Sequence, residues 1–443
     1  MIVGIRREDK NRWERRAPLT PDDVAGLIAS TGLRFHVQPS PLRIFADAEY
    51  ARAGAEVRED LSGCDLILAV KEIPLPLLLP GKSYLYFAHV VKGQAYNMPM
   101  LRRLLDLGCT LFDYELIADE RNRRLVFFGR YAGLAGMIDT LHALGRRLEI
   151  EGIASPFAEI RAAHEYADLE DAKGAIGRVG ATVAQGGLDE RLVPLVVGVT
   201  GYGHVSQGVQ EILALLPLKT IEPGQLGRLG SGRDVSRHHL YKVVFEEEHM
   251  VAPRDGQARF ELQDYYDHPE KYVSQFEGYL PHLSVLVNCI YWTERYPRLV
   301  TKDAVAALFA PGARPRLRVI GDISCDIDGS VEVTGKATDP DRPCFVYEAA
   351  TGRLLDGYEG HGPVVMAVDN LPCEIARESS GHFSRSLRDL IAASAGADLE
   401  GSFENLRMPE PLKRAAIAWQ GRLLPRFAQL EECLAKKEPD GKA

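Results

Sequence analysis

One stretch of the chain constrains its fold more than any other: a short apolar segment that runs directly into a glycine-rich turn. Residues 194–199 read Pro-Leu-Val-Val-Gly-Val, and Thr200-Gly201-Tyr202-Gly203 follow at once. A strand without polar positions has to be buried on both faces, as in a parallel sheet covered by helices on both sides. The segment therefore predicts one strand–helix unit of an open α/β sheet.

A second set of short apolar segments alternates with helical segments in the first 115 residues. Thr20 can cap a helix that has Pro21 at its first position and runs towards Ser30. The alternation predicts a second open parallel sheet, so the expected fold class is α/β with two Rossmann-like domains. The strands expected in this first sheet are residues 2–5, 35–37, 66–70, 84–87 and 110–112.

The rest of the chain continues the second sheet and then changes character. Residues 219–221, 284–287 and 318–320 are further expected strands. Residues 323–365 are rich in Gly, Asp and β-branched residues, which is typical of hairpins, and residues 379–434 are expected to be helical.

Composition excludes several classes of protein. The formal net charge of −9 and the lack of a basic block argue against nucleic-acid binding, and no apolar run is long enough to span a membrane. The seven cysteines are scattered and the N-terminus lacks the order of a secretory signal, so we expect reduced thiols and a cytoplasmic protein. His238-His239 and Glu246–His249 lack the spacing of metal ligands, so no metal is expected.

The glycine-rich turn has the pattern of a dinucleotide-binding loop. Gly201 can make the tight turn, and Gly203 lets the backbone approach a pyrophosphate at the helix N-terminus. His204 and Val205 complete the loop, and Ser206 stands where a third glycine is usual but is small enough for close packing. Glu222 follows about twenty residues later, where an acid is expected on the adenosine ribose. The alternative is an ordinary glycine-rich turn.

The sequence leaves the choice of nucleotide open. Glu222 would repel the 2′-phosphate of NADP(H), which favours NAD(H). Arg228 and Arg233 are close enough in sequence to reverse that preference.

Ionisable residues follow three consecutive strands of the first domain. Lys71 and Glu72 follow one strand, His89 the next, and Asp113 and Glu115 the third. Because parallel strands bring their carboxyl ends to one edge, where ligands bind, we expect these side chains to meet. A desolvated lysine can act as a base and a histidine can exchange protons near neutral pH. The alternative is a solvated Lys71–Glu72 ion pair with His89 capping a loop.

Two further positions suit a substrate or cofactor. Arg16 follows the first strand, and its guanidinium could hold a carboxylate bidentately, although a surface arginine is the alternative, more so for Arg15. Asp322 ends a later strand and is the best placed of three nearby aspartates to face the cofactor.

Several segments, taken together and in order, resemble one family. The chain is similar to the saccharopine dehydrogenase (L-lysine-forming), or lysine–2-oxoglutarate reductase, branch of the alanine dehydrogenase superfamily, including the reductase half of the bifunctional α-aminoadipic semialdehyde synthases. The likeness extends over nearly the whole chain. The matching segments are Glu14–Pro21, Val70–Glu72, Phe87–His89, Phe112–Glu115, Phe128–Gly136, Asn288–Trp292, Gly321–Asp326 and Asp369–Pro372.

The resemblance implies that the ε-amine of L-lysine condenses with 2-oxoglutarate and that a hydride reduces the imine to saccharopine. It implies Lys71 as the base and His89 as the acid–base group, with Glu72 and Glu115 tuning their charge. Carboxylates would be held by Arg16 and Arg124, and Asp322 would lie near the nicotinamide. NADP(H) is the cofactor favoured by the resemblance.

The resemblance also implies a discontinuous substrate-binding domain, residues 1–135 plus 372–443, with the dinucleotide-binding domain at 136–371. A cleft between the two domains would close by a hinge. Since the chain ends where the bifunctional enzymes continue, a separate saccharopine-oxidising enzyme is an expected partner. The alternatives are another amino-acid or opine dehydrogenase of the alanine dehydrogenase kind, or a catalytically silent dinucleotide-binding regulator.

Overall fold

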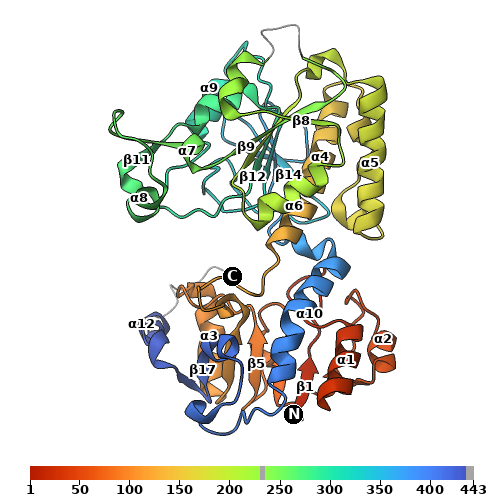
Figure 1. Cartoon of the computed structure of the whole chain (residues 1–443), viewed down its shortest axis with the longest axis vertical. Helices are drawn as coiled ribbons and strands as arrows, with labels where there is room; N and C mark the ends of the chain where they lie inside the picture. Colours follow the sequence, from red (N-terminus) through yellow and green to blue (C-terminus); the bar gives the residue numbers. More distant parts are fainter. Residues whose placement is uncertain (230–234, 436–443) are drawn as a thin grey trace. The chain divides into compact units, whose positions relative to one another are not determined.

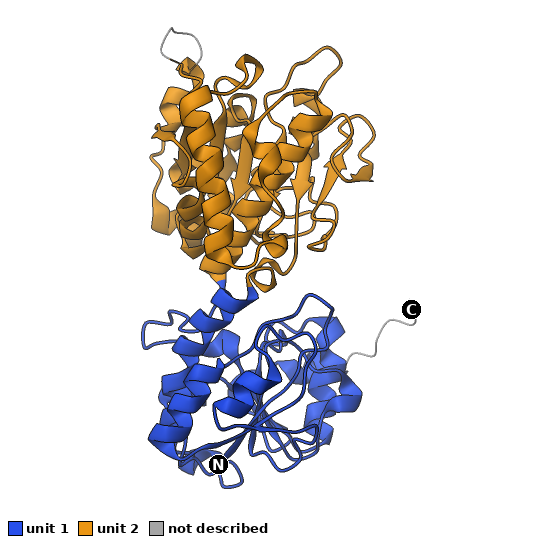
Figure 2. Cartoon of the chain, turned by 90° about the vertical axis from the view of Figure 1, so that its right-hand side faces the viewer, with its two compact units in different colours: residues 1–128, 376–443 blue, residues 129–375 orange. Residues whose placement is uncertain are grey.

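The protein consists of two compact units. The computed structural model describes residues 1–229 and 235–435. Unit 1 combines Met1–Phe128 with Ala376–Ala443, and unit 2 is Gly129–Ile375; Figure 2 shows them in two colours. The units divide here rather than at 135/136 and 371/372, because helix α4 (Gly129–Ile150) is continuous through residue 135 and Ile375 is buried in the core of unit 2.

Unit 1 is built on an eight-stranded sheet of order β18-β17-β6-β5-β4-β1-β2-β3 (Figure 1). The six strands from the N-terminal part are parallel neighbours, whereas β17 and β18 are added antiparallel at one edge. The strands are β1 (Ile2–Ile5), β2 (Arg34–Val37), β3 (Glu56–Val57), β4 (Leu66–Leu68), β5 (Ser83–Tyr86), β6 (Thr110–Asp113), β17 (Ala416–Trp419) and β18 (Arg422–Leu423).

The first helix of unit 1 begins as predicted, at Pro21. The Thr20 hydroxyl accepts a hydrogen bond from the Asp23 amide, and Gly32 ends the helix in the left-handed conformation. Helix α10 packs against this helix, and its Ser384 hydroxyl accepts a hydrogen bond from the Thr20 amide at 2.9 Å. The helices of unit 1 are α1 (Pro21–Thr31), α2 (Asp47–Arg52), α3 (Met98–Asp106), α10 (Ala376–Ala393), α11 (Glu410–Arg414) and α12 (Leu430–Ala435).

The prediction that residues 379–434 are helical is wrong for part of that range. Helix α10 ends at Ala393, and Ala416–Trp419 is the buried strand β17, which pairs with β6. Four consecutive buried residues carry no periodicity that separates a strand from a helix, so the sequence around them could not decide.

Unit 2 contains the second eight-stranded sheet, of order β15-β14-β16-β13-β12-β7-β9-β8. Strands β8, β9, β7, β12, β13 and β16 are parallel neighbours in that order. Strands β14 and β15 form an antiparallel hairpin in the region where hairpins were expected, and β14 pairs antiparallel with β16. The strands are β7 (Val196–Thr200), β8 (Leu218–Thr220), β9 (Leu240–Phe245), β12 (Val285–Asn288), β13 (Val319–Asp322), β14 (Cys344–Tyr347), β15 (Leu354–Asp356) and β16 (Val364–Met366).

Helices cover both faces of this sheet, as the buried strand β7 requires. Residues of α4, α5 (Leu169–Gly186) and α6 (His204–Leu213) form one apolar core with the sheet, and α9 (Lys302–Leu308) contributes to the core on the other face. A short helix, α7 (Glu247–Met250), leads from β9 into a small hairpin of β10 (Val251–Pro253) and β11 (Tyr272–Ser274), near which α8 (Leu262–Asp267) lies. The fold class expected from the sequence, α/β with two Rossmann-like units, is confirmed.

The closest helix–helix packing of unit 2 is between α4 and α6. A Cβ placed on Gly133 would lie 1.9 Å from the Val205 carbonyl oxygen, and one on Gly208 would lie 2.1 Å from the Arg130 carbonyl oxygen. The two glycines therefore let the helix that follows the glycine-rich turn lie directly against α4. Among the described residues, no helix is both long and apolar enough to cross a membrane.

Candidate active site and dinucleotide-binding site

Unit 1 gathers its ionisable residues at the carboxyl edge of the sheet. The strands β4, β5 and β6 are parallel neighbours in register, with Leu68 beside Leu85 and Leu85 beside Phe112. The residues that follow these strands therefore emerge side by side. The structure brings together Lys71, Glu72, His89 and Glu115, four of the residues expected from the sequence, within this one unit.

The imidazole of His89 lies between two carboxylates. Its Nε2 is 3.9 Å from Glu72 Oε1, and its Nδ1 is 3.7 Å from Glu115 Oε1. Each carboxylate has a cationic partner as well, since Lys10 Nζ donates to Glu72 at 2.9 Å and Arg124 Nη2 donates to Glu115 at 2.7 Å. Burial lowers the pKa of His89, and Glu72 opposes that effect.

The backbone of His89 is held in an unusual conformation. Its φ of 49° lies in the left-handed region, which non-glycine residues adopt only when their surroundings support it. The Asn97 side-chain amide donates to the carbonyl oxygens of Ala88 and His89, at 3.0 and 3.2 Å. The buried carboxyl of Asp113 accepts from the Ala88 amide, and burial raises its pKa to about 7. These hydrogen bonds hold the backbone at Ala88 and His89, and so fix the direction of the imidazole.

Lys71 is half-buried beside this group. Burial is the main cause that lowers the pKa of its ammonium, and the nearby Arg16 guanidinium adds to it. The carboxyl of Glu8 accepts hydrogen bonds from the amides of Val70 and Lys71, at 2.7 and 3.0 Å, and so fixes the end of the strand. Glu8 is itself buried, which together with Glu14 raises its pKa to about 7.

The two arginines expected to hold carboxylates already have carboxylate neighbours in the protein. Arg16 is buried and donates two hydrogen bonds to Glu14, from Nε at 2.7 Å and Nη2 at 2.6 Å, while its guanidinium lies over the Phe128 ring. Arg124 is more exposed and pairs with Glu115. Both lie in the same unit as Lys71.

Four residues that organise this site were not predicted from the sequence to belong to it: Glu8, Lys10, Glu14 and Asn97. Glu8, Lys10 and Glu14 follow β1, which lies beside β4, so the strand-end rule used for the other three strands would have found them. Asn97 gave no signal, because only the folded chain shows that its amide reaches two consecutive carbonyl oxygens.

Unit 2 carries the glycine-rich turn at the carboxyl end of β7. Gly201 has a φ of 77°, which a side chain would strain, and its amide donates to the Phe245 carbonyl oxygen at 2.8 Å. Gly203 caps α6, and Ser206 is fully buried in the first turn of that helix, as close packing requires. A Cβ on Gly203 would meet no protein atom within 4 Å, so the space before it is open to a ligand.

A cavity of about 370 Å³ opens beside this turn. It combines an open backbone with aromatic walls, and both features fit a dinucleotide. The helix N-terminus at His204 and Val205 lies directly after the turn. The cavity is lined by Gly201, Tyr202, Gly203, Glu247, Met250, Tyr265, Tyr266, Cys289, Ile290, Tyr291, Trp292 and Tyr296.

The two acids expected near the cofactor lie apart from each other. Asp322 ends β13, where it is buried and accepts hydrogen bonds from Asn288 Nδ2 at 2.8 Å and Thr334 Oγ1 at 2.6 Å; burial raises its pKa to about 6. Glu222 is exposed and follows β8. Strand β9 lies between β8 and β7, so β8 is not the neighbour of the strand that carries the glycine-rich turn. Arg228 lies shortly after β8, and Arg233 is outside the described residues.

The histidine-containing clusters serve local structure. The Glu246 amide donates to His249 Nδ1 at 3.1 Å, which caps α7, and His238 Nδ1 contacts the Ala184 carbonyl oxygen at 3.0 Å. Within residues 1–229 and 235–435, no three His, Cys, Asp or Glu side chains are grouped as metal ligands would be.

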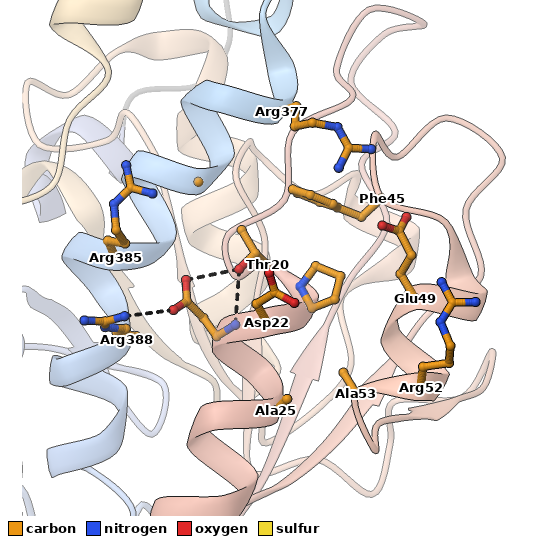
Figure 3. A pocket seen from close by; sticks show the side chains of 13 residues that line it. Thr20, Asp22, Ala25, Phe45, Glu49, Arg52, Ala53, Arg377, Arg385 and Arg388 are labelled. Atoms are coloured by element: carbon orange, nitrogen blue, oxygen red, sulfur yellow. Dashed lines mark hydrogen bonds and ion pairs between the residues drawn. The ribbon is translucent and has the colours of Figure 1, made fainter. Parts of the chain in front are cut away.

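A larger cavity of unit 1, about 600 Å³, lies away from Lys71 and His89, between α1, α2 and α10 (Figure 3). Asp23 receives hydrogen bonds there from Thr20 and Arg388. Both cations and carboxylates line this cavity, so its charge is mixed. The charged residues that line it are Asp22, Asp23, Glu49, Arg52, Arg377, Arg385 and Arg388.

Comparison with known proteins shows what the chain and its fold resemble. Residues 4–135 match the model of the alanine dehydrogenase/PNT N-terminal domain. An L-alanine dehydrogenase structure superposes with a TM-score of 0.62 at 18% identity, covering 98% of this chain and all of the other. A transhydrogenase from Sinorhizobium meliloti gives a TM-score of 0.52 at 16% identity, over 96% of this chain and all of the other. The N-terminal part of the chain therefore matches this domain family, and the whole chain has the fold of an L-alanine dehydrogenase.

The sequence relatives have more specific names than the structural neighbours. The chain is 40% identical to alpha-aminoadipic semialdehyde synthase of Arabidopsis thaliana over 99% of its own length and 42% of that protein. It is 35% identical to the mitochondrial enzyme of that name from Bos taurus, over 99% of the chain and 48% of that protein. The chain thus spans about half the length of these relatives. It is 29% identical to saccharopine dehydrogenase [NAD(+), L-lysine-forming] of Neurospora crassa, over 87% of the chain and 89% of that protein.

Proposed function

We propose that the protein is a lysine–2-oxoglutarate reductase, a saccharopine dehydrogenase of the L-lysine-forming type that works in lysine degradation. The observation that carries the proposal is the arrangement at the carboxyl edge of unit 1, where Lys71 with a lowered pKa accompanies a histidine placed between two carboxylates. Reductive condensation of an amine with a keto acid needs both a base for the amine and a proton donor for the departing water.

The residues of unit 1 divide this work. Lys71, whose ammonium is destabilised by burial, takes a proton from the substrate amine, which then attacks the keto carbon of 2-oxoglutarate. His89 gives a proton to the carbinolamine oxygen as water leaves and the imine forms. Glu72 and Glu115 hold the imidazole and set its charge. Arg16 and Arg124 provide guanidinium groups for the substrate carboxylates.

We assign the amino acid and the keto acid to unit 1 and the dinucleotide to unit 2. Gly201, Gly203, His204, Val205 and Ser206 hold the pyrophosphate at the N-terminus of α6. The nicotinamide supplies the hydride that reduces the imine, and Asp322 is assigned to its end of the site. The family resemblance by itself favours NADP(H), with NAD(H) as the alternative.

The cysteines support a cytoplasmic location. The seven cysteines are scattered through the sequence, a pattern more typical of reduced thiols than of a disulfide framework.

The proposal is tested by following the oxidation of reduced nicotinamide with 2-oxoglutarate and a panel of amines, with each nucleotide in turn. Turnover with L-lysine, and not with ammonia, alanine or ornithine, is the expected result. Turnover with ammonia and pyruvate would move the protein to the alanine dehydrogenase type of reaction. Nucleotide binding without turnover on any amine would contradict an enzymatic role and favour a regulator.

A further inference from the structure

The strand that lies beside the glycine-rich turn is not the one expected from the sequence. β9 pairs with β7 along its length, from Val196 beside Tyr241 to Thr200 beside Phe245. β8 pairs with the outer side of β9, with Leu218 beside Leu240. Glu222, which follows β8, therefore belongs to a strand two places away from the turn.

The position beside the turn matters for nucleotide recognition. In an open α/β sheet, a dinucleotide lies across the carboxyl ends of the strands, and its adenosine ribose faces the end of the strand next to the loop strand. An acid at that end receives the ribose hydroxyl. In this protein that end is Phe245, and the residues that follow it directly are Glu246 and Glu247.

Glu247 is the acid that reaches the cavity. It lines the same cavity as Gly201 and Gly203, whereas Glu222 does not. Its side chain is also oriented, because the Tyr266 hydroxyl donates to Glu247 Oε1 at 2.7 Å. Its charge is felt at the turn itself, since Glu247 is the main cause that raises the pKa of Tyr202.

The charge of this cavity is one-sided. No lysine or arginine is among the described residues that line it, so Glu247 is its one ionised group near neutral pH. A carboxylate accepts a hydrogen bond from a ribose hydroxyl but repels a 2′-phosphate, which carries negative charge.

We propose that Glu247, and not Glu222, receives the adenosine ribose and makes the protein prefer NAD(H) to NADP(H). The proposal rests on the proposed function in one respect, namely that the cavity of unit 2 binds a nicotinamide dinucleotide. The proposed preference for NAD(H) is the opposite of the preference for NADP(H) that the family resemblance implies.

The test is direct binding, without lysine or 2-oxoglutarate. NADH and NADPH are titrated into the whole protein, and energy transfer from tryptophan to the reduced nicotinamide is followed, since Trp292 lines the cavity. We expect the wild type to bind NADH at least about tenfold more tightly than NADPH, and E247Q to lose most of that difference. E222Q, the same change at the acid expected from the sequence, should keep the wild-type ratio.

Two results would overturn the proposal: tighter binding of NADPH by the wild type, or a ratio that collapses in E222Q and persists in E247Q. If E247Q does not fold, Tyr266→Phe replaces it, because it keeps the carboxylate but releases it from its hydroxyl donor, and the ratio should then fall only partly. If the protein prefers NADH to NADPH but does not turn over lysine, the proposed function is refuted and the role of Glu247 is not. Absence of any nucleotide binding would refute both.

Discussion

The two units contain sheets of the same kind but use the carboxyl edges of these sheets differently. In unit 1 that edge carries Lys71, His89 and buried carboxyls whose pKa values burial raises to about 7. In unit 2 it carries an open glycine turn, an aromatic cavity and the hydrogen-bonded Asp322. The proposed function assigns proton transfer to the first edge and dinucleotide binding to the second. The fold alone therefore does not determine function, which depends on the side chains that follow each strand.

Lys71 is the residue of unit 1 whose replacement should reduce activity most. Lys71→Met should lower kcat by about 10²–10⁴-fold, because it removes the base that neutralises the amine. Nucleotide affinity should not change, since the turn and its cavity belong to unit 2. Steady-state kinetics and nucleotide titration check both halves of this prediction. The control is Lys219→Met, an exposed lysine on β8. Activity within a few-fold of the wild type would remove Lys71 from the chemistry.

The reciprocal change lies in unit 2. Gly203→Ala should weaken dinucleotide binding at least about tenfold, because the methyl group enters the space that the pyrophosphate needs. The fold should tolerate it, since that Cβ meets no protein atom within 4 Å, and the free energy of unfolding should change by less than about 1 kcal/mol. Nucleotide titration and chemical unfolding measure the two quantities. Gly177→Ala, on α5 and equally open, is the control. Unchanged affinity in Gly203→Ala would mean that the nucleotide lies elsewhere.

A third variant tests the buried carboxyls of unit 1. The pKa of Glu8 is raised from 4.5 to about 7, so the folded protein binds this proton more tightly than the unfolded chain does. Between about pH 4.5 and pH 7, this group makes the free energy of unfolding decline as pH rises; above pH 7 its contribution no longer changes. Glu8→Gln cannot ionise, so its stability should decline less across the same window. Chemical unfolding at a series of pH values measures the two slopes.

Glu56→Gln, an exposed carboxylate of the same unit, should reproduce the wild-type slope. A Glu8→Gln slope equal to that of the wild type would show that Glu8 ionises as it does in the unfolded chain. Because Glu8 also fixes the Lys71 amide, Glu8→Gln should lower kcat more than Glu56→Gln does.

The smallest expected effect is a displacement of the pH profile. Glu72 raises the pKa of both His89 and Lys71. Glu72→Gln should therefore lower both pKa values and move both limbs of the profile of kcat/KM to lower pH. Glu115→Gln should move the His89 limb the same way but less, because Glu115 acts on that pKa more weakly than Glu72 does. A profile that moves to higher pH would contradict the assigned roles.

Local signals predicted much of this molecule. The apolar run at residues 194–199 predicted a buried strand, and Thr20 predicted the start of a helix. Both features depend on a few neighbouring residues, so the sequence shows them directly. The group of Lys71, His89 and Glu115 was found by one further rule, that parallel strands share an edge. The alternation of strands and helices made that rule applicable.

What the sequence could not predict depends on contacts between distant segments. The insertion of β9 between β7 and β8 is a matter of strand order, which no local pattern encodes, and it separates Glu222 from the turn. The burial of Glu8 likewise arises only when the loop after β1 packs beside β4, where the Val70 amide donates to its carboxyl.

The proposed function requires unit 1 to join lysine to 2-oxoglutarate through the side-chain amine. The most direct measurement is the mass spectrum of the product formed from lysine with isotopically labelled side-chain nitrogen, 2-oxoglutarate and reduced nicotinamide dinucleotide. We expect a secondary amine that contains both carbon skeletons and keeps the label, formed by the wild type and not by Lys71→Met. Labelled glutamate, or no product that joins the two skeletons, would contradict it.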